Sequence, residues 1–519
     1  MKTNCRFVAR SLAAALLALP LVPAGAAAQP APPAQPPAQP TPDTAGQPPP
    51  PPPPPDGTGQ PQPPPPPPDG ATQPPAPPPA PPPPPPPPAP APAASDPSVP
   101  LVSKIKVTVY GYVETNLVAH STQSCNEFCS NLPIQKSGTY RGDHGRTVFT
   151  ARDSRFGLKL AAPPVGDVKV TGQIETDFFG PTTTTEQGTW ANPVLRIRHS
   201  FLKFETPWAD ILVGQTWNLF GWQANYLVAS VQEPGLPGQM FQRTPQVRVT
   251  KTIKQGKTSV ELAVAANRPP QMDSGTPEGV AAARLVLGQQ TGLHTGYMTS
   301  TTVTPASIGV SADVRRFRIA EFSPTPKKAN TLIGGGVAFN AFLPIIAATK
   351  ENKDHALSLS GEIVIGRGTS DMYTGLGAAG TVNAAVPGAN PGDPSTPYTA
   401  NFDPGFAAYT ATGQLALIKW TSYMIGAEYY VPGTDGRLGF FANYGHMQSA
   451  NAGRFGGVNA LDPVLGRTRD HENFFDLGVF VDPTKGTRVG VDGGLYDDHY
   501  ADGTRARNYS LMSNVYLFF

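Results

Sequence analysis

A strict alternation of apolar and polar residues runs through residues 168–179, which read VKVTGQIETDFF. Small or apolar side chains occupy every second position, including Val168, Val170, Ile174 and Phe178. Polar side chains fill the positions between them, including Lys169, Gln173, Glu175 and Asp177. A period of two residues predicts a β-strand whose two faces meet different surroundings. The class of protein therefore depends on what covers the apolar face.

The same alternation recurs from Lys104 to Phe519. It is clear in six segments: KIKVTVYGYVETNL, TSVELAVAAN, HALSLSGEIVIG, FFDLGVFVD, TRVGVDGGLY and NYSLMSNVYLFF. A helical period near 3.6 residues is almost absent, so we predict an all-β domain. A soluble β-sandwich would also alternate in this way, and periodicity alone leaves both architectures open.

The connections between the predicted strands favour a transmembrane barrel. Short turns (AAPPVGD, TPWAD, KQGK, VPGTDG and DPTKG) alternate with long loops around residues 120–146, 219–244, 367–406 and 448–471. Short turns at one rim and long loops at the other are typical of outer-membrane barrels. With about 9–11 residues per crossing we count roughly 16 antiparallel strands. Residues 281–317 hold either two strands with an insertion or three irregular strands. Residues 409–431 are too long for one simple strand, and we expect this segment to extend above the membrane.

The last strand supports the same architecture. The chain ends at Phe519, and every second residue back to Tyr509 gives a mostly apolar face. This ending resembles the C-terminal signature by which the barrel-insertion machinery recognises outer-membrane proteins. Because lipid offers no hydrogen bonds, the only sheet that pairs every backbone group there is a closed barrel. We therefore expect Val168 and its set to face lipid, and Glu175 and its set to face a water-filled lumen.

Composition divides the chain into three parts. Residues 1–28 have a basic start, a short apolar core and small residues for cleavage, so they predict a signal peptide. Of the 65 prolines, 39 lie in residues 29–100, which predicts a disordered, extended polyproline II spacer in the periplasm. This spacer is either inert or docks to the cell wall. Residues 101–519 form the predicted barrel in the outer membrane of a Gram-negative type of cell.

Charge and cysteines narrow the possibilities further. A net charge of +2 gives no reason to expect a nucleic-acid partner. No segment after the signal approaches the ~20 apolar residues of a membrane helix. Cys125 and Cys129 would meet an oxidising compartment, so we expect a small disulfide loop. A redox or metal pair is the alternative, although further Cys or nearby His partners are missing.

Charged residues predicted to face the lumen could set ion selectivity. In VLRIRHSF we expect Leu195, Ile197 and Phe201 to face outward and the arginines inward. The predicted basic ladder contains Arg155, Lys159, Arg196, Arg198 and Arg248. The carboxylates that face or flank it are Asp153, Glu175, Asp177 and Glu261. Guanidinium groups bind carboxylates in a bidentate way, so the ladder favours anions. The alternative is that these arginines only neutralise the neighbouring carboxylates.

Residues 214–246 are too long and too aromatic for an ordinary exposed loop. The aromatic side chains that need a packing surface are Trp217, Phe220, Trp222 and Tyr226. A loop folded back into the barrel would provide one, so we predict that this loop narrows the pore. An external cap or a subunit contact is the alternative.

Several segments together carry a family resemblance: VYGYVETN, DSRFGLKL, GQIETDFFG, LRIRHSFLKF, ILVGQTWNLF and the final VYLFF. They resemble the DcaP-like trimeric outer-membrane porins and, more loosely, the general bacterial porins. The resemblance covers most of 104–260 and the last strands. It implies a homotrimer of 16-stranded barrels, a constricting third loop, and passive diffusion of small anionic solutes such as dicarboxylates. The implied pore arginines are Arg196, Arg198 and Arg248. The proline-rich segment departs from the helical extension of that group.

Two other functions are alternatives to a channel. A membrane-embedded hydrolase would need a recognisable nucleophile or metal motif, and none of the eight histidines lies in one. We therefore expect no enzyme activity, no catalytic residue, no metal and no cofactor. A structural anchor that ties the outer membrane to the cell wall through residues 30–100 is the second possibility, and it is compatible with a channel.

Overall fold

The computed structural model describes residues 104–129, 132–181, 193–232, 235–296, 300–321, 323, 325–376, 405–409, 414–454 and 468–519. The predicted signal peptide and proline-rich spacer lie outside these residues. Within them, no helix has both the length and the apolar character that a membrane crossing requires.

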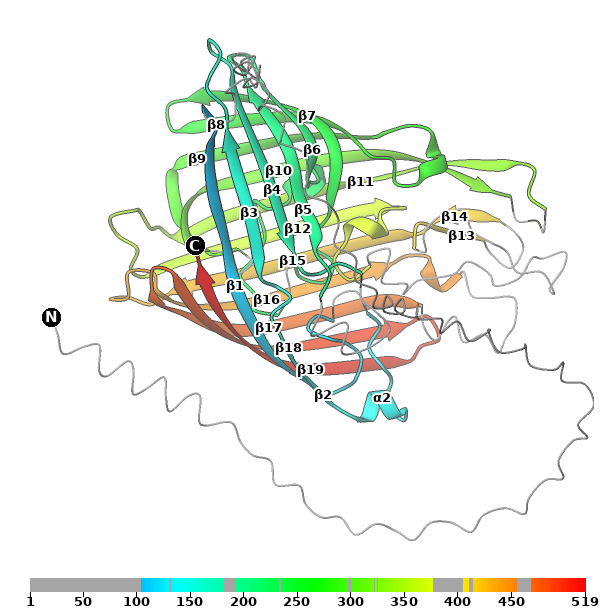
Figure 1. Cartoon of the computed structure of the whole chain (residues 1–519). Helices are drawn as coiled ribbons and strands as arrows, with labels where there is room; N and C mark the ends of the chain where they lie inside the picture. Colours follow the sequence, from blue (N-terminus) through cyan, green and yellow to red (C-terminus); the bar gives the residue numbers. More distant parts are fainter. Residues whose placement is uncertain are drawn as a thin grey trace, which may run out of the picture. The chain divides into compact units, whose positions relative to one another are not determined.

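One large antiparallel sheet makes up this part of the chain (Figure 1). Its first strands are β1 (Lys106–His120), β2 (Arg146–Thr150), β3 (Arg155–Ala161), β4 (Lys169–Asp177), β5 (Arg196–Glu205), β6 (Asp210–Trp217), β7 (Arg243–Gln255), β8 (Thr258–Asn267) and β9 (Glu278–His294). The others are β10 (Thr302–Ala320), β11 (Ala329–Ile346), β12 (Ala356–Arg367), β15 (Lys419–Tyr430), β16 (Leu438–Ser449), β17 (Arg469–Thr484), β18 (Thr487–Tyr500) and β19 (Arg505–Phe518). Both β2 and β3 pair with β1, so the 17 strands of the sheet make 16 crossings.

The sheet closes on itself. From β3 onward each strand of the sheet pairs with the next strand of the sheet, β12 pairs with β15, and β1 pairs with β19 from Tyr112↔Phe518 to His120↔Ser510. At the end of this seam the amide of Gly111 donates to the carbonyl of Phe519 at 3.0 Å, and the amide of Phe519 donates back at 3.1 Å. The predicted barrel of about 16 strands is confirmed.

Short connections lie at one rim and long ones at the other, which we call the turn end and the loop end. The turn end holds, for example, residues 206–209 and 256–257, and the loop end holds 121–145 (loop L1) and 218–242 (loop L3). Residues 281–317 form two long strands, β9 and β10. Residues 409–431 contain β15 and the short β14 (Leu415–Leu417), which pairs with β13 (Ala407–Tyr409).

The loops contain the few helical turns. These are α2 (Tyr140–Asp143), η2 (Phe220–Trp222), η3 (Met272–Ser274), η4 (Ser370–Met372) and η6 (Ala452–Arg454). Only α2 is an α-helix among the described residues, and Thr139 caps it by accepting from the amide of Gly142 at 3.0 Å.

The alternating apolar side chains of residues 168–179 lie on the outer face of the barrel, and the polar ones between them lie on the inner face. Ile174 is 45% exposed on the outside of the barrel, whereas Glu175 and Asp177 are 5% and 2% exposed on the inside. Outward Val, Leu, Ile and Phe side chains recur on the other strands, and no second protein layer covers them among the described residues. Lipid is the surrounding that such a face fits.

Candidate functional site: a basic chamber in the lumen

A cavity of about 600 Å³ lies inside the barrel. Its wall comes from β1 and β3 to β6, from L3, and from the turn-end halves of β9 and β10. The charged or ionisable side chains that line it are Arg155, Lys159, Glu175, Arg198, His199, Arg284 and His294. We call this cavity the chamber.

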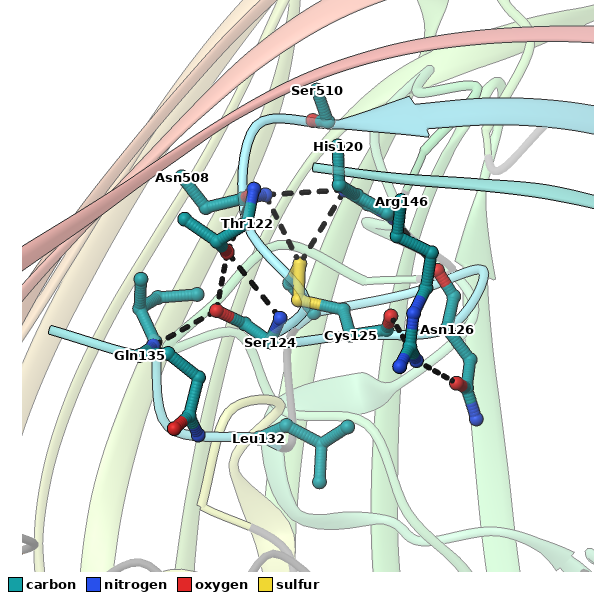
Figure 2. The surroundings of a disulfide bond; sticks show 12 residues. His120, Thr122, Ser124, Cys125, Asn126, Leu132, Gln135, Arg146, Asn508 and Ser510 are labelled. Carbon is teal, nitrogen blue, oxygen red and sulfur yellow. Dashed lines mark hydrogen bonds between the residues drawn. A yellow bond between two sulfur atoms is a disulfide. The ribbon is translucent and has the colours of Figure 1, made fainter. Parts of the chain in front are cut away.

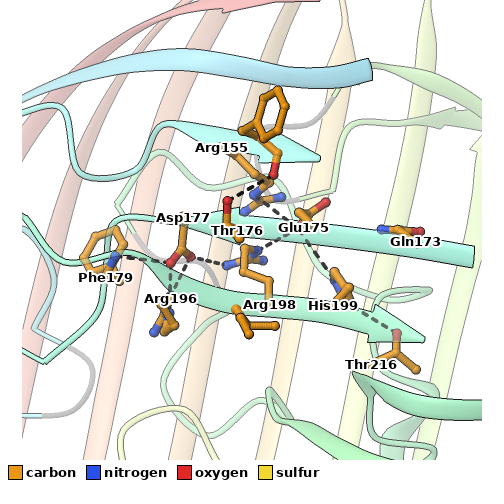
Figure 3. A network of polar contacts seen from close by, with 12 residues as sticks. Arg155, Gln173, Glu175, Thr176, Asp177, Phe179, Arg196, Arg198, His199 and Thr216 are labelled. Atoms are coloured by element: carbon orange, nitrogen blue, oxygen red, sulfur yellow. Dashed lines mark hydrogen bonds and ion pairs between the residues drawn. The ribbon is translucent and has the colours of Figure 1, made fainter. Parts of the chain in front are cut away.

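Two carboxylates of β4 organise the basic side of the chamber (Figure 3). Asp177 accepts hydrogen bonds from both Nε and Nη2 of Arg196, at 2.9 and 2.7 Å, in a bidentate pair. Arg198 connects the two acids, because its Nε donates to Glu175 Oε1 at 2.7 Å and its Nη1 donates to Asp177 Oδ2 at 2.8 Å. Paired buried charges of this kind hold each other in fixed positions.

The other cations are held less tightly. Arg155 Nε lies 3.5 Å from Glu175 Oε1, and its guanidinium lies over the ring of Tyr112. Lys159 Nζ lies 4.6 Å from the ring centre of Tyr110 and remains exposed to the lumen. Both side chains line the chamber and present positive charge to it.

A second pair stands on neighbouring strands β8 and β9. Arg284 Nη2 lies 2.8 Å from Glu261 Oε2, and the guanidinium also lies over the ring of Trp222. Counting this pair with the β3–β5 cluster gives five cations (Arg155, Lys159, Arg196, Arg198, Arg284) and three anions (Glu175, Asp177, Glu261). The formal balance of these eight side chains is +2.

Five of the nine predicted charged residues lie outside the chamber lining: Asp153, Asp177, Arg196, Arg248 and Glu261. Asp177, Arg196 and Glu261 belong to the ion pairs described above. Asp153 occupies the break between β2 and β3 and accepts a hydrogen bond from Asn116 Nδ2. Arg248 on β7 donates to Gln246 Oε1 at 2.8 Å and to the carbonyl of Trp217, so it supports the end of β6. The structure thus groups Arg155, Lys159, Arg196 and Arg198 and leaves Arg248 beside them.

The orientation expected for Phe201 was wrong. The register between β4 and β5 shifts between Glu175 and Thr176, which is a β-bulge. The bulge turns both Arg198 and His199 inward, and every following residue of β5 changes face. Phe201 consequently lines the chamber, while Leu202 is 50% exposed outside.

L3 lies inside the barrel, and its aromatic residues pack on the inner wall. Phe220 is fully buried, and Trp222 Nε1 donates to the carbonyls of Ala283 and Val310 at 3.1 and 3.3 Å. Gly221 has φ = 79°, and a Cβ there would lie 2.8 Å from Met240 Cβ, so glycine is required. Tyr226 is buried beside the chamber, and Trp217 at the end of β6 lines it.

The far side of L3 is attached to strands that come much later in the chain. Asp492 on β18 accepts the amides of Val231 and Gln232 at 3.1 and 3.3 Å. Asp476 on β17 accepts the hydroxyl of Ser230 at 2.8 Å. L3 therefore crosses the lumen, and its segment that faces the chamber (Ala224, Asn225 and Leu227) carries no charge.

On the turn side, the end of the β9–β10 hairpin bends away from the wall and bounds the chamber. Pairing of β9 with β8 ends at Leu287, whereas β9 continues to His294. His294 Nδ1 lies 2.8 Å from Glu428 Oε1 on β15, and the amide of Thr295 donates to Glu428 Oε2 at 2.8 Å. Thr301 Oγ1 accepts from Arg488 Nη2 on β18 at 2.9 Å. The irregular pattern of residues 281–317 indicated a departure from simple strands, but not that the hairpin bends inward.

Three functional residues were not predicted. Arg284 lies in the segment of uncertain register, but its alternation with outward Leu285 could have revealed it. His199 is turned inward by the bulge, which has no clear sequence signal. Arg243 stacks over Trp217 at 4.8 Å, and its Nη1 has no hydrogen-bond partner among the described residues.

L1 contains the disulfide between Cys125 and Cys129 (Figure 2). His120 lies beside it. Among the described residues, His120, Cys125 and Cys129 are the potential metal ligands whose ligand atoms lie close enough together to bind one ion. Both sulfur atoms are used in the disulfide, so the group lacks the thiolates a metal would need. In the same loop, burial raises the pKa of the Glu127 carboxyl, and Arg152 at 3.1 Å opposes this.

No protein-family model matches the sequence, and no curated protein matches it. Solved structures do match. The outer membrane channel DcaP of Acinetobacter baumannii superposes with a TM-score of 0.53 and 18% sequence identity, over 80% of this chain and 98% of that chain. The chain has the fold of the outer-membrane porins.

Two further porins match with lower scores. The anion-selective porin from Comamonas acidovorans gives a TM-score of 0.44 at 12% identity, over 80% of this chain and 100% of that one. OprB of Pseudomonas putida gives 0.44 at 9% identity, over 81% and 95%. The likeness to DcaP confirms the porin resemblance predicted from the sequence, and at this identity it establishes the fold alone.

Proposed function

We propose that this chain forms a water-filled channel through which small hydrophilic anions, small carboxylates among them, diffuse passively across the outer membrane. The observation that carries this proposal is the chamber wall. Cations of β3, β5 and β9 face an L3 segment without charge, and the formal balance of the cluster is +2. A pore lined in this way lowers the electrostatic energy of a passing anion.

The hydrogen-bonding geometry supports carboxylates in particular. Arg196 and Arg198 already hold protein carboxylates in bidentate and bridging contacts. Lys159, which is exposed beside them with no carboxylate contact recorded among the described residues, provides a free cation for a solute. A solute carboxylate passing L3 would therefore exchange water for ammonium and guanidinium donors.

Lys159→Ala tests the proposal most cleanly. Its side chain has few contacts to lose, whereas Arg198 is buried between two acids. A unit charge about 6 Å from an ion in water contributes ~0.7 kcal/mol, with opposite signs for an anion and a cation. We therefore expect the anion-to-cation permeability ratio to fall about tenfold at low ionic strength. The ratio is measured from the reversal potential of the channel in a planar bilayer under a salt gradient.

Lys203→Ala is the matched control. Lys203 also lies on the inner side of β5, but it pairs with Glu205 and Asp210 at the turn end, at 3.0 and 2.8 Å. Its removal should leave the ratio nearly unchanged. A cation-selective wild-type channel, or equal effects of the two variants, would refute the proposed role of the chamber.

We further propose a homotrimer with the loop end outside the cell and residues 29–100 in the periplasm. The outward side chains of β2 to β5 include Phe149, Phe156, Ile197 and Leu202, which are 47–71% exposed and uncharged. This sector suits contacts between barrels. The strand ending at Phe519, which is 55% exposed, is available to the barrel-insertion machinery.

A further inference from the structure

A polar patch lies on the outer surface of β16 to β19, at the loop end and separate from the lumen. The strand registers place its side chains in two rows that point outward. His471, His499 and Arg505 lie side by side in the upper row. The row below contains, from β16 to β19, His446, Asn473, Asp497 and Arg507. Because all of these positions share the face of Phe475 and Leu477, which are 47% and 57% exposed, the patch faces away from the lumen.

The patch begins where the apolar band of the barrel ends. The next row toward the turn end contains Tyr444, Phe475 and Tyr509, which form an aromatic girdle. The ten-residue step from Phe519 to Tyr509, at about 3.3 Å per residue and a tilt of about 40°, rises about 25 Å. This height equals that of the lipid-facing band of an outer-membrane barrel. The polar rows therefore lie at the level of the lipid headgroups.

A pocket of about 260 Å³ opens beside the two arginines. L1 contributes Gln135, Ser137 and Gly142 to it, and β19 contributes Arg505, Ala506 and Arg507. L1 is held there by Lys136 Nζ, which lies 2.9 Å from Asp502 Oδ2 in the loop between β18 and β19. The helical turn α2 lies near the loop end of β19 (Figure 1). The pocket is thus built by two segments that are distant in the sequence.

The charge at the pocket is positive. Arg505 and Arg507 both contact the same carboxylate, Asp497, the second at 3.4 Å. The two guanidinium groups are 45% and 46% exposed, so they keep donors available on the outside. His471 and His499 stack at 3.8 Å in the neighbouring row and add ring N–H groups. The two guanidiniums outnumber the one carboxylate that they share at the pocket, while Asp470, 2.8 Å from His471, adds a negative charge beside the upper row.

We propose that this pocket, with the adjoining polar rows, binds the phosphate group of a phosphorylated lipid of the outer leaflet. Phosphate is the headgroup that a guanidinium pair recognises in a bidentate way. The girdle below the pocket would contact the acyl chains of the same lipid. The proposal rests on the placement of the barrel in the outer membrane and not on its solute selectivity, since none of these side chains faces the chamber.

The experiment compares two double variants of the full chain, purified in mild detergent. Arg505→Ala with Arg507→Ala removes two charges at the pocket. Lys254→Ala with Lys257→Ala removes two exposed charges at the turn end and serves as the control. Native mass spectrometry measures binding of a diphosphorylated glucosamine lipid, its dephosphorylated form, and inorganic phosphate.

We expect the wild type and the control to bind the diphosphorylated lipid and not the dephosphorylated one. The arginine variant should bind at least about tenfold more weakly, because two charge-assisted hydrogen bonds are lost. The Asp497→Asn variant should bind the lipid more tightly than the wild type, because both guanidiniums lose the carboxylate that they contact. If the arginine variant does not fold, the Asp497→Asn variant still tests the proposal.

Four results would overturn the proposal. The first is equal binding of the diphosphorylated lipid by the arginine and lysine variants, and the second is equal binding of the diphosphorylated and dephosphorylated lipids by the wild type. The third is inorganic phosphate bound as tightly as the lipid, and the fourth is a changed oligomeric mass of the arginine variant with unchanged lipid binding. The last result would assign the patch to contacts between copies of the chain. Channel conductance should stay the same in every variant, so failure here is distinct from failure of the proposed channel function.

Discussion

At the scale of single residues, Arg198 has the most connected position in the chamber wall. It donates to Glu175 at 2.7 Å and to Asp177 at 2.8 Å, and its side chain is 6% exposed. Each acid has a second arginine, Arg155 for Glu175 and Arg196 for Asp177. Without Arg198 each carboxylate would keep one arginine and its neutral donors, Tyr110 for Glu175 and the Phe179 amide for Asp177, but the bridge between the two acids would be lost. Their mutual repulsion in a buried site would rise.

We therefore expect Arg198→Ala to destabilise the barrel by about 2 kcal/mol, as for the loss of a buried charged hydrogen bond. The shift of the urea unfolding midpoint in lipid vesicles measures this. Lys203→Ala, which breaks a half-exposed ion pair, should cost less than about 1 kcal/mol. Similar shifts for the two variants would show that the bridge adds nothing beyond a surface pair.

From the sequence it was possible to predict which side chains face the lumen, but not which of them lie close together. Alternation with apolar neighbours was sufficient to place Arg155, Lys159, Arg196 and Arg198 inside, because a strand has only two faces. Alternation gives no distance between strands, so it could not separate Arg248 from the cluster or bring Arg284 into it. The bulge at Glu175 was invisible because it depends on pairing with the next strand.

At the scale of elements, L3 and the β9–β10 hairpin bound the chamber from opposite sides. The aromatic composition of residues 214–246 predicted the inward loop, since exposed Trp and Phe need a packing surface. The hairpin end has no comparable signal. Its inward bend depends on Glu428, which is 134 residues from His294 in the chain.

Asp492→Ala should loosen L3, because the amides of Val231 and Gln232 lose their acceptor. We expect a larger single-channel conductance and more open-channel current noise in planar bilayers, as the loop samples positions away from the wall. Asp492→Asn keeps one acceptor oxygen and should stay close to the wild type. Identical traces for Ala and wild type would show that Asp476 and the aromatic packing hold the loop without Asp492.

At the scale of the whole molecule, the closed sheet of residues 106–518 holds every element on which the proposed channel depends. The seam between β1 and β19 completes every backbone pairing, and the chamber is built from residues 110–307. The alternating pattern, the turn lengths and the apolar last strand were sufficient to predict this architecture, because a barrel imposes one simple rule on every strand.

Deletion of residues 29–100 should therefore leave the unit conductance, the ion selectivity and the number of channels per assembly unchanged. Bilayer recordings and the mass of the purified assembly test this. Loss of envelope integrity with normal conductance would assign the proline-rich segment to tethering. A changed conductance would mean that the segment takes part in the pore.

The attachment of L3 to Asp492 has a consequence for biogenesis. The acceptor follows its donors by about 260 positions in the chain, so this attachment forms only after β18 has joined the sheet. The contacts of Trp222 with β9 and β10 join segments much closer in the chain, so the near side of L3 can dock on the wall earlier. The last strands that close the barrel thus also complete the fixing of L3 across the lumen.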